Sequence, residues 1–351
     1  MPDPVRILVT WPDDWVRKAI FPPEQVKRLE AIGQVTWNPS EKNYTPEQLA
    51  AELRDKHAVI TGWGTNRLTA EVIADAKDLS FVGHSAGSVG SIASEAVYDR
   101  GIVVTTANDV MARQVAEFNV MLMLMGLRHY RYFCDPMHAS GKQYEWRGSM
   151  SSEVAPRPML GAKVGIIGLG AISRWVIRML QPMEPEILLY SRHTKPDEAK
   201  QLGIKLVTLE ELLRTCDAIN VLCGLTEKTR HLLNAERLAL IKDGAILINT
   251  GRGAIIDEQA LVEALKPGRF LAALDVYDVE PLPPDSPLRT LPNVILAPHM
   301  AGGGNERNYS RYVIDELERH LAGQALQGTI PRELWANMTV HELVRKKKDE
   351  S

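Results

Sequence analysis

The sequence contains few cysteines, and their spacing suits neither a metal site nor a disulfide framework. Only three occur in 351 residues, at Cys134, Cys216 and Cys223. None belongs to a CxxC pair, which argues against zinc binding and against dithiol redox chemistry. An odd and sparse set of thiols is typical of a reducing compartment, so we expect a cytoplasmic protein.

The sequence also lacks an excess of basic charge and a long apolar run. Its net charge of -3 gives no electrostatic footprint for nucleic acid, and the basic run 345–348 is interpreted as a solvated tail. A charge interrupts the short apolar run at the N-terminus, which argues against a signal peptide. The most apolar helical stretch, "VMLMLMGL" from Val120, is too short to span a bilayer. We therefore expect no nucleic-acid partner and no membrane segment.

The residues that are present suit two globular domains. Hydrophobic residues make up 45% and charged residues 24% of the chain, as in ordinary globular proteins, and the length exceeds that of one small core. Short apolar runs in the first part alternate with helical patterns. The apolar runs lie at residues 5–10, 57–63, 79–86 and 101–107, and the helical patterns at 46–56 and 69–76. This alternation predicts a parallel sheet with helices on both faces.

A second alternation of the same kind begins at Lys163. A long helical pattern at about 112–130 precedes it, and the Pro- and Gly-rich stretch 134–160 is predicted to be an irregular arm. Seven strand-like runs then begin at residues 163, 186, 204, 218, 245, 270 and 294. This series, with helices between most runs, predicts a doubly wound sheet. A helix is expected at 306–322, followed by a polar tail.

A glycine-rich turn follows the first of these seven runs. In "VGIIGLGAISRWVIRML", Gly168-x-Gly170-x-x-Ser173 lies between an apolar strand and an amphipathic helix. Gly168 permits a tight turn, Gly170 lets a pyrophosphate approach the backbone, and the small Ser173 still allows helix and strand to pack closely. Free N–H groups at the helix N-terminus would bind the phosphates. The alternative is an ordinary turn with chance glycines, but strand, spacing and helix together favour a dinucleotide site.

The next run lacks the acidic residue that usually binds the adenosine ribose of NAD. That residue is expected roughly 20 positions beyond the turn. Here the strand ends in Ser191-Arg192-His193, and Lys195 lies close by. An acid would repel the 2′-phosphate of NADP, whereas a hydroxyl and a planar guanidinium suit it. We predict NADP as the preferred cofactor; the alternative is that Arg192 stacks on adenine or faces solvent and NAD is accepted.

Three polar residues follow later strands, at the sheet edge where open α/β sheets bind ligands. Arg252 lies in a Gly-Arg-Gly turn, Glu280 follows the strand ending near Val276, and His299 follows Ala297-Pro298. Taken singly, each has an ordinary explanation: a loop charge, a surface turn or a capping histidine. Their occurrence in order behind a dinucleotide turn indicates a site for hydride transfer.

These motifs resemble the D-isomer-specific 2-hydroxyacid dehydrogenase family. The likeness covers about residues 100 to 305 and is looser in the N-terminal part. It rests on Gly168-x-Gly170, Asn249-Thr250-x-Arg252-Gly253, Ala273-Leu274-Asp275-Val276 with Glu280-Pro281, Pro292-Asn293-Val294 with Pro298-His299, Val115-Ala116-Glu117 and Trp146.

The resemblance implies an α/β architecture of two Rossmann-like doubly wound domains with the active site in a cleft between them. A flavodoxin-like substrate domain would comprise residues 1–107 and 301–351, and a dinucleotide-binding domain residues 108–300. An arm at about 131–160 would dock on a second copy and give a homodimer. The implied activity is NAD(P)-dependent reduction of a small 2-keto acid, or oxidation of a D-2-hydroxy acid.

The family also implies roles for the matching residues. His299 would be the acid/base that protonates the substrate oxygen, and Glu280 would bond its other ring nitrogen and fix the tautomer. Arg252 would hold the substrate carboxylate and polarise the keto oxygen, and Asp275 would hold the nicotinamide carboxamide. Further contacts with the cofactor are expected from Ala171, Ile172, Cys223, Gly224, Thr229, Thr250 and Gly251.

Two features of the first domain point to the substrate. The turn "HSAGSVGSI" (84–92) is glycine-rich, as in the family, although it lacks the aspartates that commonly follow. Backbone N–H groups of Ala86, Gly87 and Ser88 would lie near the substrate carboxylate. Trp63 ends a strand, and the sequence leaves open whether it lines the substrate pocket or is a packing tryptophan.

Two related activities and one unrelated one are alternatives. Formate dehydrogenases share the architecture and resemble the chain near Tyr190 and His193, but they typically lack the glutamate partner of the histidine, so Glu280 favours a 2-keto acid. Some relatives are transcriptional corepressors, so a dinucleotide-sensing binding protein of the same fold remains an alternative. A Rossmann enzyme acting on amino acids would not need this order of Arg252, Glu280 and His299.

Overall fold

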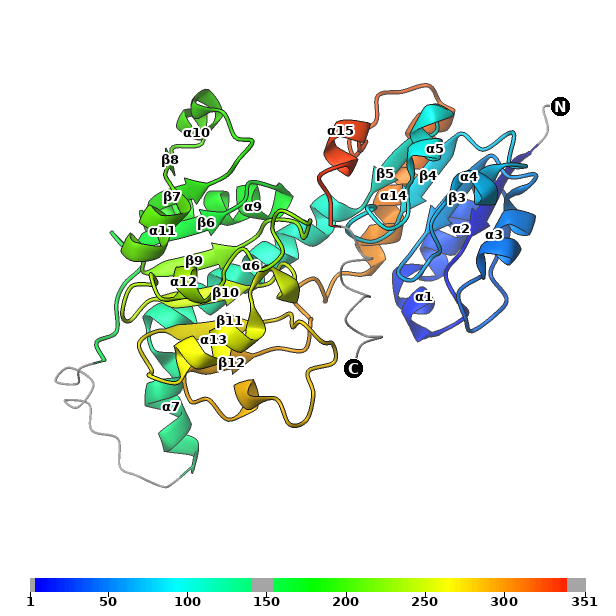
Figure 1. Cartoon of the computed structure of the whole chain (residues 1–351). Coiled ribbons are helices and arrows are strands. Elements are labelled where there is room, and N and C mark those ends of the chain that lie inside the picture. Colours follow the sequence, from blue (N-terminus) through cyan, green and yellow to red (C-terminus); the bar gives the residue numbers. More distant parts are fainter. Residues whose placement is uncertain (1–3, 140–153, 340–351) are drawn as a thin grey trace. The chain divides into compact units, whose positions relative to one another are not determined.

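The computed structural model describes residues 4–139 and 154–339 and divides the chain into two compact units (Figure 1). Unit 1 joins the residues up to Ala112 to the segment from Gly303, and unit 2 is built from Arg113–Gly302. Each unit has its own parallel sheet flanked by helices, which confirms the predicted α/β class with two doubly wound sheets. Trp146 and the basic run 345–348 lie outside the described residues.

Unit 1 contains a five-stranded sheet in the order β2-β1-β3-β4-β5. The strands are β1 (Val5–Val9), β2 (Gly33–Trp37), β3 (Ala58–Thr61), β4 (Phe81–His84) and β5 (Val103–Thr106). The four predicted runs form β1, β3, β4 and β5, and β3 and β4 are buried along their whole length. The sequence did not predict β2 because this edge strand, GQVTW, is partly exposed and has no continuous apolar run.

The helices of unit 1 cover both faces of this sheet. They are α1 (Trp15–Ile20), α2 (Pro23–Ile32), α3 (Pro46–Leu53), α4 (Ala70–Ile73), α5 (Glu95–Asp99) and α14 (Arg307–Leu321). Thr45 and Gln48 form a capping box that fixes the start of α3. The returning α14 approaches β4 closely: a Cβ at Gly83 would lie 2.4 Å from Cγ1 of Val313. Glycine at this position therefore allows the C-terminal helix to complete the core of the N-terminal sheet.

The segment after α14 does not behave as the expected polar tail. Thr329 forms an antiparallel bridge with Thr105, and the N–H of Ile330 donates to the carbonyl of Val104 at 2.9 Å. The short helix α15 (Arg332–Trp335) follows, and its last residue packs against the core of unit 1. The prediction was wrong because the few apolar residues of this segment show no periodicity, and its order comes from pairing with β5.

Unit 2 contains a seven-stranded sheet in the order β12-β11-β10-β9-β6-β7-β8. The strands are β6 (Lys163–Ile167), β7 (Glu186–Tyr190), β8 (Lys205–Leu206), β9 (Ala218–Val221), β10 (Ile246–Asn249), β11 (Leu271–Leu274) and β12 (Val294–Leu296). Each of the seven predicted runs contains one strand. The strand order reverses at β6, which pairs with both β7 and β9, and ligands bind outside the carboxyl ends of strands at such a point.

Helices flank this second sheet. They are α6 (Asn108–Leu127), α7 (Tyr130–Ala139), α9 (Ala171–Leu180), α10 (Pro196–Gln201), α11 (Leu209–Thr215), α12 (Ala235–Leu238) and α13 (Glu258–Leu265), with 3₁₀ turns η1 (Gln181–Met183), η2 (Gly253–Ile255) and η3 (Pro287–Arg289). Helix α9 directly follows β6, as the glycine turn predicts.

Helix α6 begins and ends a few residues earlier than the helix predicted at about 112–130. It has 20 residues and a window of mean hydropathy 1.3, so by length and composition it could cross a membrane, contrary to the expectation from the run at Val120. In the structure 44% of that window is buried. Ala116, Leu122 and Met123 pack in one cluster with residues of β6, so this face of the helix belongs to the core of unit 2.

Helix α7 replaces the first part of the predicted irregular arm. The helix continues through Pro136 to Ala139. Proline removes one backbone N–H from the helical ladder, and the ion pair from Arg131 to Asp135 (2.7 Å) spans the same turn. The prediction that irregular structure begins at Cys134 was therefore wrong. Most of the remaining arm lies outside the described residues.

A buried carboxylate ties three segments of unit 2 together. Asp217, whose side chain is 12% exposed, accepts the N–H of Lys163 at 2.9 Å and binds Arg157 at 2.7 Å and Lys242 at 2.6 Å. Burial alone would raise the pKa of Asp217. The hydrogen bond from Lys242, the N–H of Lys163 and the two positive charges outweigh it, so this pKa lies below its ordinary value. The ionised carboxylate thus stabilises the fold.

We expect Asp217→Asn to lower the free energy of unfolding by about 1–2 kcal/mol at pH 7, because it removes charged hydrogen bonds. A carboxyl group with a depressed folded pKa stabilises above its unfolded pKa of about 3.9, and this contribution is lost as the pH falls through the folded pKa. The difference between wild type and variant in urea unfolding should therefore shrink on acidification. Asp243→Asn, at a carboxylate that is 78% exposed, is the control. An equal loss at pH 7 and pH 3 would contradict the electrostatic explanation.

Candidate active site

The glycine turn after β6 has the geometry of a phosphate-binding turn. Gly168 has a φ of +94°, and a Cβ there would lie 2.7 Å from Cα of Cys223, so a side chain does not fit. At Gly170 a Cβ would meet no atom within 4 Å among the described residues. Ser173 is buried, and its Oγ donates to the carbonyl of Gly168 at 2.7 Å. The turn is therefore packed against Cys223 at Gly168 and open at Gly170, where a pyrophosphate can approach the backbone.

The N-terminus of α9 supplies the donors for such an anion. Gly170 is the N-cap residue, Ala171 and Ile172 open the helix, and no described side chain caps it. The first N–H groups of a helix have no intrahelical acceptor and carry partial positive charge. This part of the chain therefore fits the phosphates of a dinucleotide without change in the backbone.

The end of β7 presents basic side chains without acidic partners. The Oγ of Ser191 accepts the N–H groups of His193 (3.4 Å) and Thr194 (3.3 Å) and so shapes the turn. Arg192, His193 and Lys195 are exposed, and none forms an ion pair with a described residue. Uncompensated positive charge at this position suits a phosphate on the adenosine ribose.

The ends of β9 and β10 form the next part of the same sheet edge. The Oγ1 of Thr229 donates to the carbonyl of Gly224 at 2.7 Å and closes the loop after β9. Burial raises the pKa of Cys223 to about 11, so its thiol stays protonated at neutral pH, which fits a packing residue. Thr250 accepts a hydrogen bond from Asn119 of α6 at 2.7 Å. These loops lie beside the glycine turn because β9 pairs directly with β6.

Arg252 is held in a constrained turn. The side chain of Asn249 accepts the N–H of Gly251 at 3.1 Å and donates to the carbonyl of Arg252 at 3.0 Å. A Cβ at Gly253 would lie 1.9 Å from the carbonyl carbon of Tyr277, so glycine allows this turn to pack against the loop after β11. The guanidinium is partly buried, donates to the carbonyl of Gly251 at 2.6 Å, and forms no ion pair with any described carboxylate. Burial lowers its pKa, but arginine keeps its charge.

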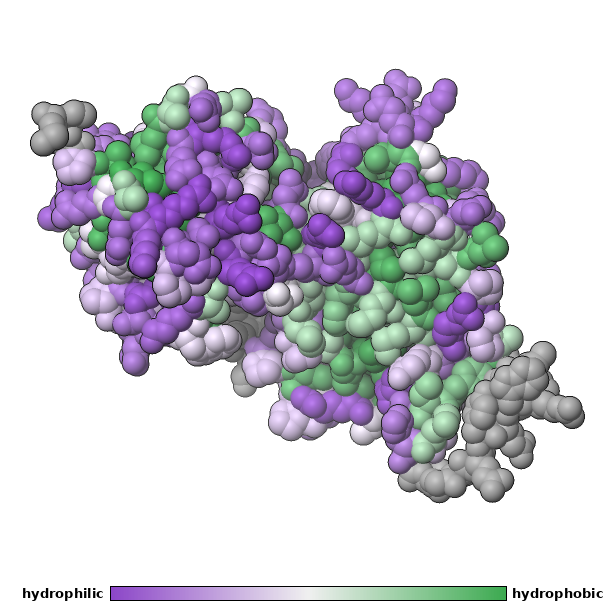
Figure 2. Space-filling view, turned by 180° about the vertical axis from the view of Figure 1, so that it is seen from behind, coloured by the Kyte–Doolittle hydropathy of each residue, from purple (hydrophilic) through white to green (hydrophobic). Residues whose placement is uncertain are grey.

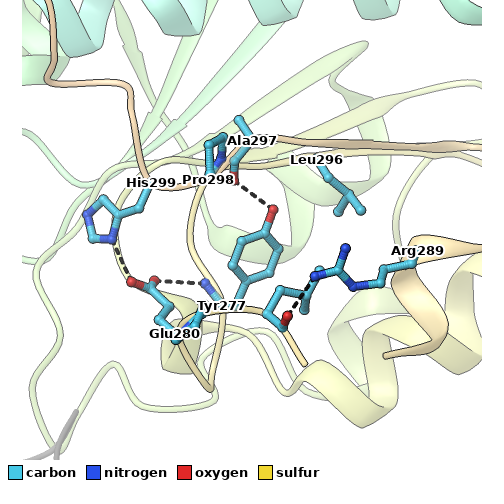
Figure 3. Close-up of a pocket in the computed structure, with 9 residues that line it drawn as sticks. Tyr277, Glu280, Arg289, Leu296, Ala297, Pro298 and His299 are labelled. Carbon is cyan, nitrogen blue, oxygen red and sulfur yellow. Dashed lines mark hydrogen bonds and ion pairs between the residues drawn. The ribbon is translucent and has the colours of Figure 1, made fainter. Parts of the chain in front are cut away.

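Glu280 and His299 form a hydrogen-bonded pair (Figure 3). Nδ1 of His299 lies 2.6 Å from Oε2 of Glu280, and Oε1 of Glu280 accepts the N–H of Tyr277 at 3.1 Å. Burial would raise the pKa of Glu280, but the hydrogen bond from His299 and its charge hold this pKa below its ordinary value. An ionised carboxylate only accepts, so it assigns the proton to Nδ1 and leaves Nε2 to act on a ligand.

The backbone around this pair is fixed from both sides. His299 has a φ of +55°, a left-handed conformation that is rare outside glycine and clusters at functional sites. Asp275 is fully buried and accepts the N–H groups of Met300 (2.8 Å) and Ala301 (3.0 Å). Burial raises its pKa against the opposing effect of these two donors. Asp275 thus anchors the loop that follows the histidine.

The pair borders a cavity of about 470 Å³. In Figure 3 the ring of Tyr277 lies beside the pair, and its hydroxyl donates to the carbonyl of Ala297 at 2.8 Å. Sequence reasoning missed Tyr277, Asn249 and Asn119 as supports of the site. Asn249 lies inside the Asn-Thr-Gly-Arg-Gly motif, and Tyr277 lies only three residues before Glu280, so both have a local signal that could have found them. Asn119 carries none, because its partner Thr250 is 131 residues away.

In unit 1, the turn after β4 contains backbone N–H groups that have no acceptor among the described residues. The Oγ1 of Thr106 donates to the carbonyls of Ala86 (2.9 Å) and Gly87 and so holds the turn. Within the described part of the chain, the N–H groups of Ala86, Gly87 and Ser88 donate no hydrogen bond. Such a group of free N–H donors is suited to a carboxylate.

Trp63 lies two residues beyond the end of β3, the strand next to β4 in unit 1. Its ring packs edge-on against Trp11 (5.4 Å between centroids) and Tyr309 (6.5 Å), yet it stays 48% exposed. Trp11 is buried and donates to the Oγ of Ser85 at 2.7 Å. The tryptophan is therefore partly a packing residue and partly an apolar surface beside the free N–H groups.

Comparison with known proteins gives a consistent result. The family model "D-isomer specific 2-hydroxyacid dehydrogenase, NAD binding domain" matches residues 120–301. D-3-phosphoglycerate dehydrogenase of Methanocaldococcus jannaschii is 33% identical over 93% of this chain, which spans only 59% of that longer protein. Glyoxylate reductase of Aeropyrum pernix is 34% identical over 84% of this chain and 88% of its own length.

A solved structure agrees with these relatives. The 2-hydroxyacid dehydrogenase from Ketogulonicigenium vulgare Y25 is 26% identical, has a TM-score of 0.73, and covers 94% of this chain and 99% of its own. The match over residues 120–301 and the near full-length likeness to the glyoxylate reductase confirm the resemblance seen in the sequence motifs. The chain therefore belongs to the D-isomer specific 2-hydroxyacid dehydrogenase family.

Proposed function

We propose that the protein is an NAD(P)-dependent reductase of 2-keto acids or, in the reverse direction, a dehydrogenase of D-2-hydroxy acids. The observation that carries this proposal is the contact of 2.6 Å between Nδ1 of His299 and Oε2 of Glu280. The pair lies at the carboxyl edge of the same sheet that carries the open glycine turn at Gly168 and Gly170. Unit 2 therefore contains both a pair of residues suited to proton transfer and a turn suited to a dinucleotide.

His299 would exchange the proton of the reaction. A bound nicotinamide supplies or accepts the hydride at the substrate carbon. Nε2 of the imidazolium donates its proton to the keto oxygen, which becomes the hydroxyl, and the neutral imidazole keeps its other proton on Nδ1, hydrogen-bonded to Glu280. The ionised Glu280 accepts the hydrogen bond from Nδ1 and fixes the orientation of the ring.

Arg252 would bind the substrate. One guanidinium nitrogen is committed to the carbonyl of Gly251, and the remaining donors have no carboxylate partner among the described residues. A partly buried guanidinium can hold a carboxylate with two parallel hydrogen bonds and polarise the adjacent keto oxygen. In unit 1, the N–H groups of Ala86, Gly87 and Ser88 also suit a carboxylate, and the exposed part of Trp63 suits an apolar substituent.

The cofactor is proposed to be NADP in preference to NAD. The support is the group of Arg192, His193 and Lys195, which have no acidic partner in the described structure. The remaining cofactor contacts are proposed for the edge of β6, β9 and β10. They are Ala171, Ile172, Ser191, Cys223, Gly224, Thr229, Thr250, Gly251 and, for the carboxamide, Asp275.

We also propose that the protein is a homodimer. Hydrophobic residues gather on the face of unit 2 formed by α6 and α7 (Figure 2). Met121, Tyr132 and Met137 are 42%, 55% and 52% exposed on these helices. A contiguous apolar surface of this kind is typical of a contact with another protein. We propose a second copy of the chain as the partner, because the resemblance to the family implies that the arm at about 131–160 docks on one.

His299→Ala is expected to lower kcat by about 10²–10⁴-fold, because it removes the proton donor of the transition state. NADPH affinity, measured by nucleotide fluorescence, should stay within about twofold, since His299 does not belong to the phosphate or adenosine sites. Loss of cofactor affinity to the same degree as kcat would show that the assigned role is wrong.

Assays should cover glyoxylate, hydroxypyruvate and phenylpyruvate. Background rates of the unaltered protein with every keto acid would favour the dinucleotide-sensing binding protein.

Arg192→Ala should raise the Kd for NADPH by about tenfold or more, because a charged hydrogen bond to the 2′-phosphate is lost. The Kd for NADH should hardly change. Lys205→Ala, at a basic residue that begins β8, is the matched control and should affect neither cofactor. If Arg192→Ala raises the Kd for NADH as much as the Kd for NADPH, the proposed preference for NADP is contradicted.

Met121→Glu should convert a dimer into a monomer, because it introduces a charge into the apolar face of α6. The molecular mass is measured by light scattering after size exclusion. Trp15→Glu, at a tryptophan of unit 1 that is 78% exposed, should leave the mass unchanged. A monomeric unaltered protein would overturn the proposed dimer.

A further inference from the structure

The C-terminal strap, which we define as residues 331–339, lies on the loop that joins β4 to α5. At Gly90, in the middle of this loop, a Cβ would lie 2.3 Å from the carbonyl oxygen of Thr339 and 3.3 Å from Cβ of Met338. The two backbones are therefore in direct contact, and the contact requires glycine at position 90. The strap covers the loop only a few residues beyond Ser88.

The strap is anchored by an aromatic side chain. The ring of Trp335 lies 5.3 Å from the ring of Tyr98 on α5, and the guanidinium of Arg67 lies 5.9 Å from its centroid. Arg67 also donates to the carbonyl of Ala93, at the end of the loop, at 3.2 Å. Trp335 thus contacts both the helix that follows the loop and a side chain that holds the loop itself.

Arg332 forms a second anchor on α5. Arg332 donates to the carbonyl of Glu95 at 3.2 Å and forms an ion pair with Asp99. This pair is exposed, so its contribution is screened by solvent. The apolar anchor is the stronger one, because Trp335 and Met338 pack against a core cluster that includes Val89 and Ile92 of the loop.

The loop needs such support because it has no regular structure of its own. Residues 85–94 lie between β4 and α5, and the carbonyls of Ala86 and Gly87 are tied by Thr106 at one end. In the middle, the N–H of Gly90 donates locally to the Oγ of Ser88 at 3.2 Å. An anion site made of backbone N–H groups binds well only if their directions are fixed before the ligand arrives.

We infer that the C-terminal strap holds the N–H groups of Ala86, Gly87 and Ser88 in position for the substrate carboxylate, and that Trp335 is the positioning residue. The inference rests on the proposed function for the identity of the ligand. The attachment of the strap to the loop, which we call the tether, rests on the contacts at Gly90, Tyr98 and Arg67. Trp335 acts through the loop and touches neither the substrate nor the cofactor.

Trp335 is well suited to substitution because its Nε1 has no hydrogen-bond partner among the described residues. Trp335→Ala therefore removes the contacts of the ring, including that with Arg67, without breaking a hydrogen bond, and Trp335→Phe keeps an aromatic ring. Trp15→Ala is the matched control, since Trp15 is 78% exposed on α1 and does not belong to the strap. All variants are made in the full-length chain.

Two readouts are measured, hydrogen–deuterium exchange of peptides covering 84–94 and steady-state kinetics. In Trp335→Ala the loop amides should exchange faster, while peptides of β1 and β3 keep their rates. KM for the 2-keto acid should rise about tenfold, as expected when an N–H no longer reaches a charged group. The kcat and the Kd of NADPH should stay within about twofold, because the proton donor and the cofactor site lie in unit 2. Trp335→Phe should restore both readouts, and Trp15→Ala should change neither.

Gly90→Ala tests the same contact from the loop side, with Trp335 intact. Its Cβ would collide with the carbonyl of Thr339, so the strap must shift, and KM should again rise with little change in kcat. Unchanged loop exchange in Trp335→Ala would overturn the tether. Faster exchange without a change in KM would overturn the positioning role, and so would a parallel loss of kcat and NADPH affinity.

The failure of this inference can be told apart from that of the proposed function. If the unaltered protein turns over no 2-keto acid, the proposed function fails. Deuterium exchange then decides the tether alone: faster loop exchange in Trp335→Ala supports it, and unchanged exchange overturns it.

Discussion

The hydrogen bond between His299 and Glu280 depends on holding two irregular loops in register at the ends of neighbouring strands. β11 pairs in parallel with β12, so the loops that follow them leave the sheet at the same edge. The sheet alone does not orient the side chains. Asp275 binds the backbone beyond His299, and Glu280 binds the N–H of Tyr277, so each loop is fixed by a carboxylate. These hydrogen bonds to the backbone hold the two loops at the positions that bring the side chains together.

Carboxylates that accept backbone N–H groups recur wherever this chain must fix an irregular segment. Asp217 joins three segments of unit 2. In unit 1, the fully buried Glu316 of α14 accepts the N–H groups of Gln327 and Gly328 and so directs the chain toward the strap. A buried charge is costly unless several donors meet it, and backbone amides supply those donors without side-chain entropy. The same physical device thus supports both the proton-transfer pair and the loop proposed to bind the substrate.

Sequence patterns predicted the strands well where strands are buried, because an apolar run between turn residues has few other solutions in an α/β chain. They failed where order comes from tertiary contacts. The edge strand β2 is half exposed, α7 continues through Pro136 with an ion pair across the turn, and residues 329–330 are ordered by pairing with β5. The sequence also could not decide the role of Trp63, because a tryptophan after a strand is equally expected for a packing residue and for a binding residue.

By itself, the sequence determined the kinds of residue available to the site and their places at strand ends. Gly168, Arg252, Glu280 and His299 are recognisable because each follows a strand, and parallel strands bring their carboxyl ends to one edge. The tertiary structure decided which of them touch, which atoms meet and what holds them. The contact of 2.6 Å between His299 and Glu280 joins residues 19 apart, and the strap reaches a loop more than 200 residues earlier. Such contacts depend on packing, because a local pattern carries no information about a partner that only folding brings near.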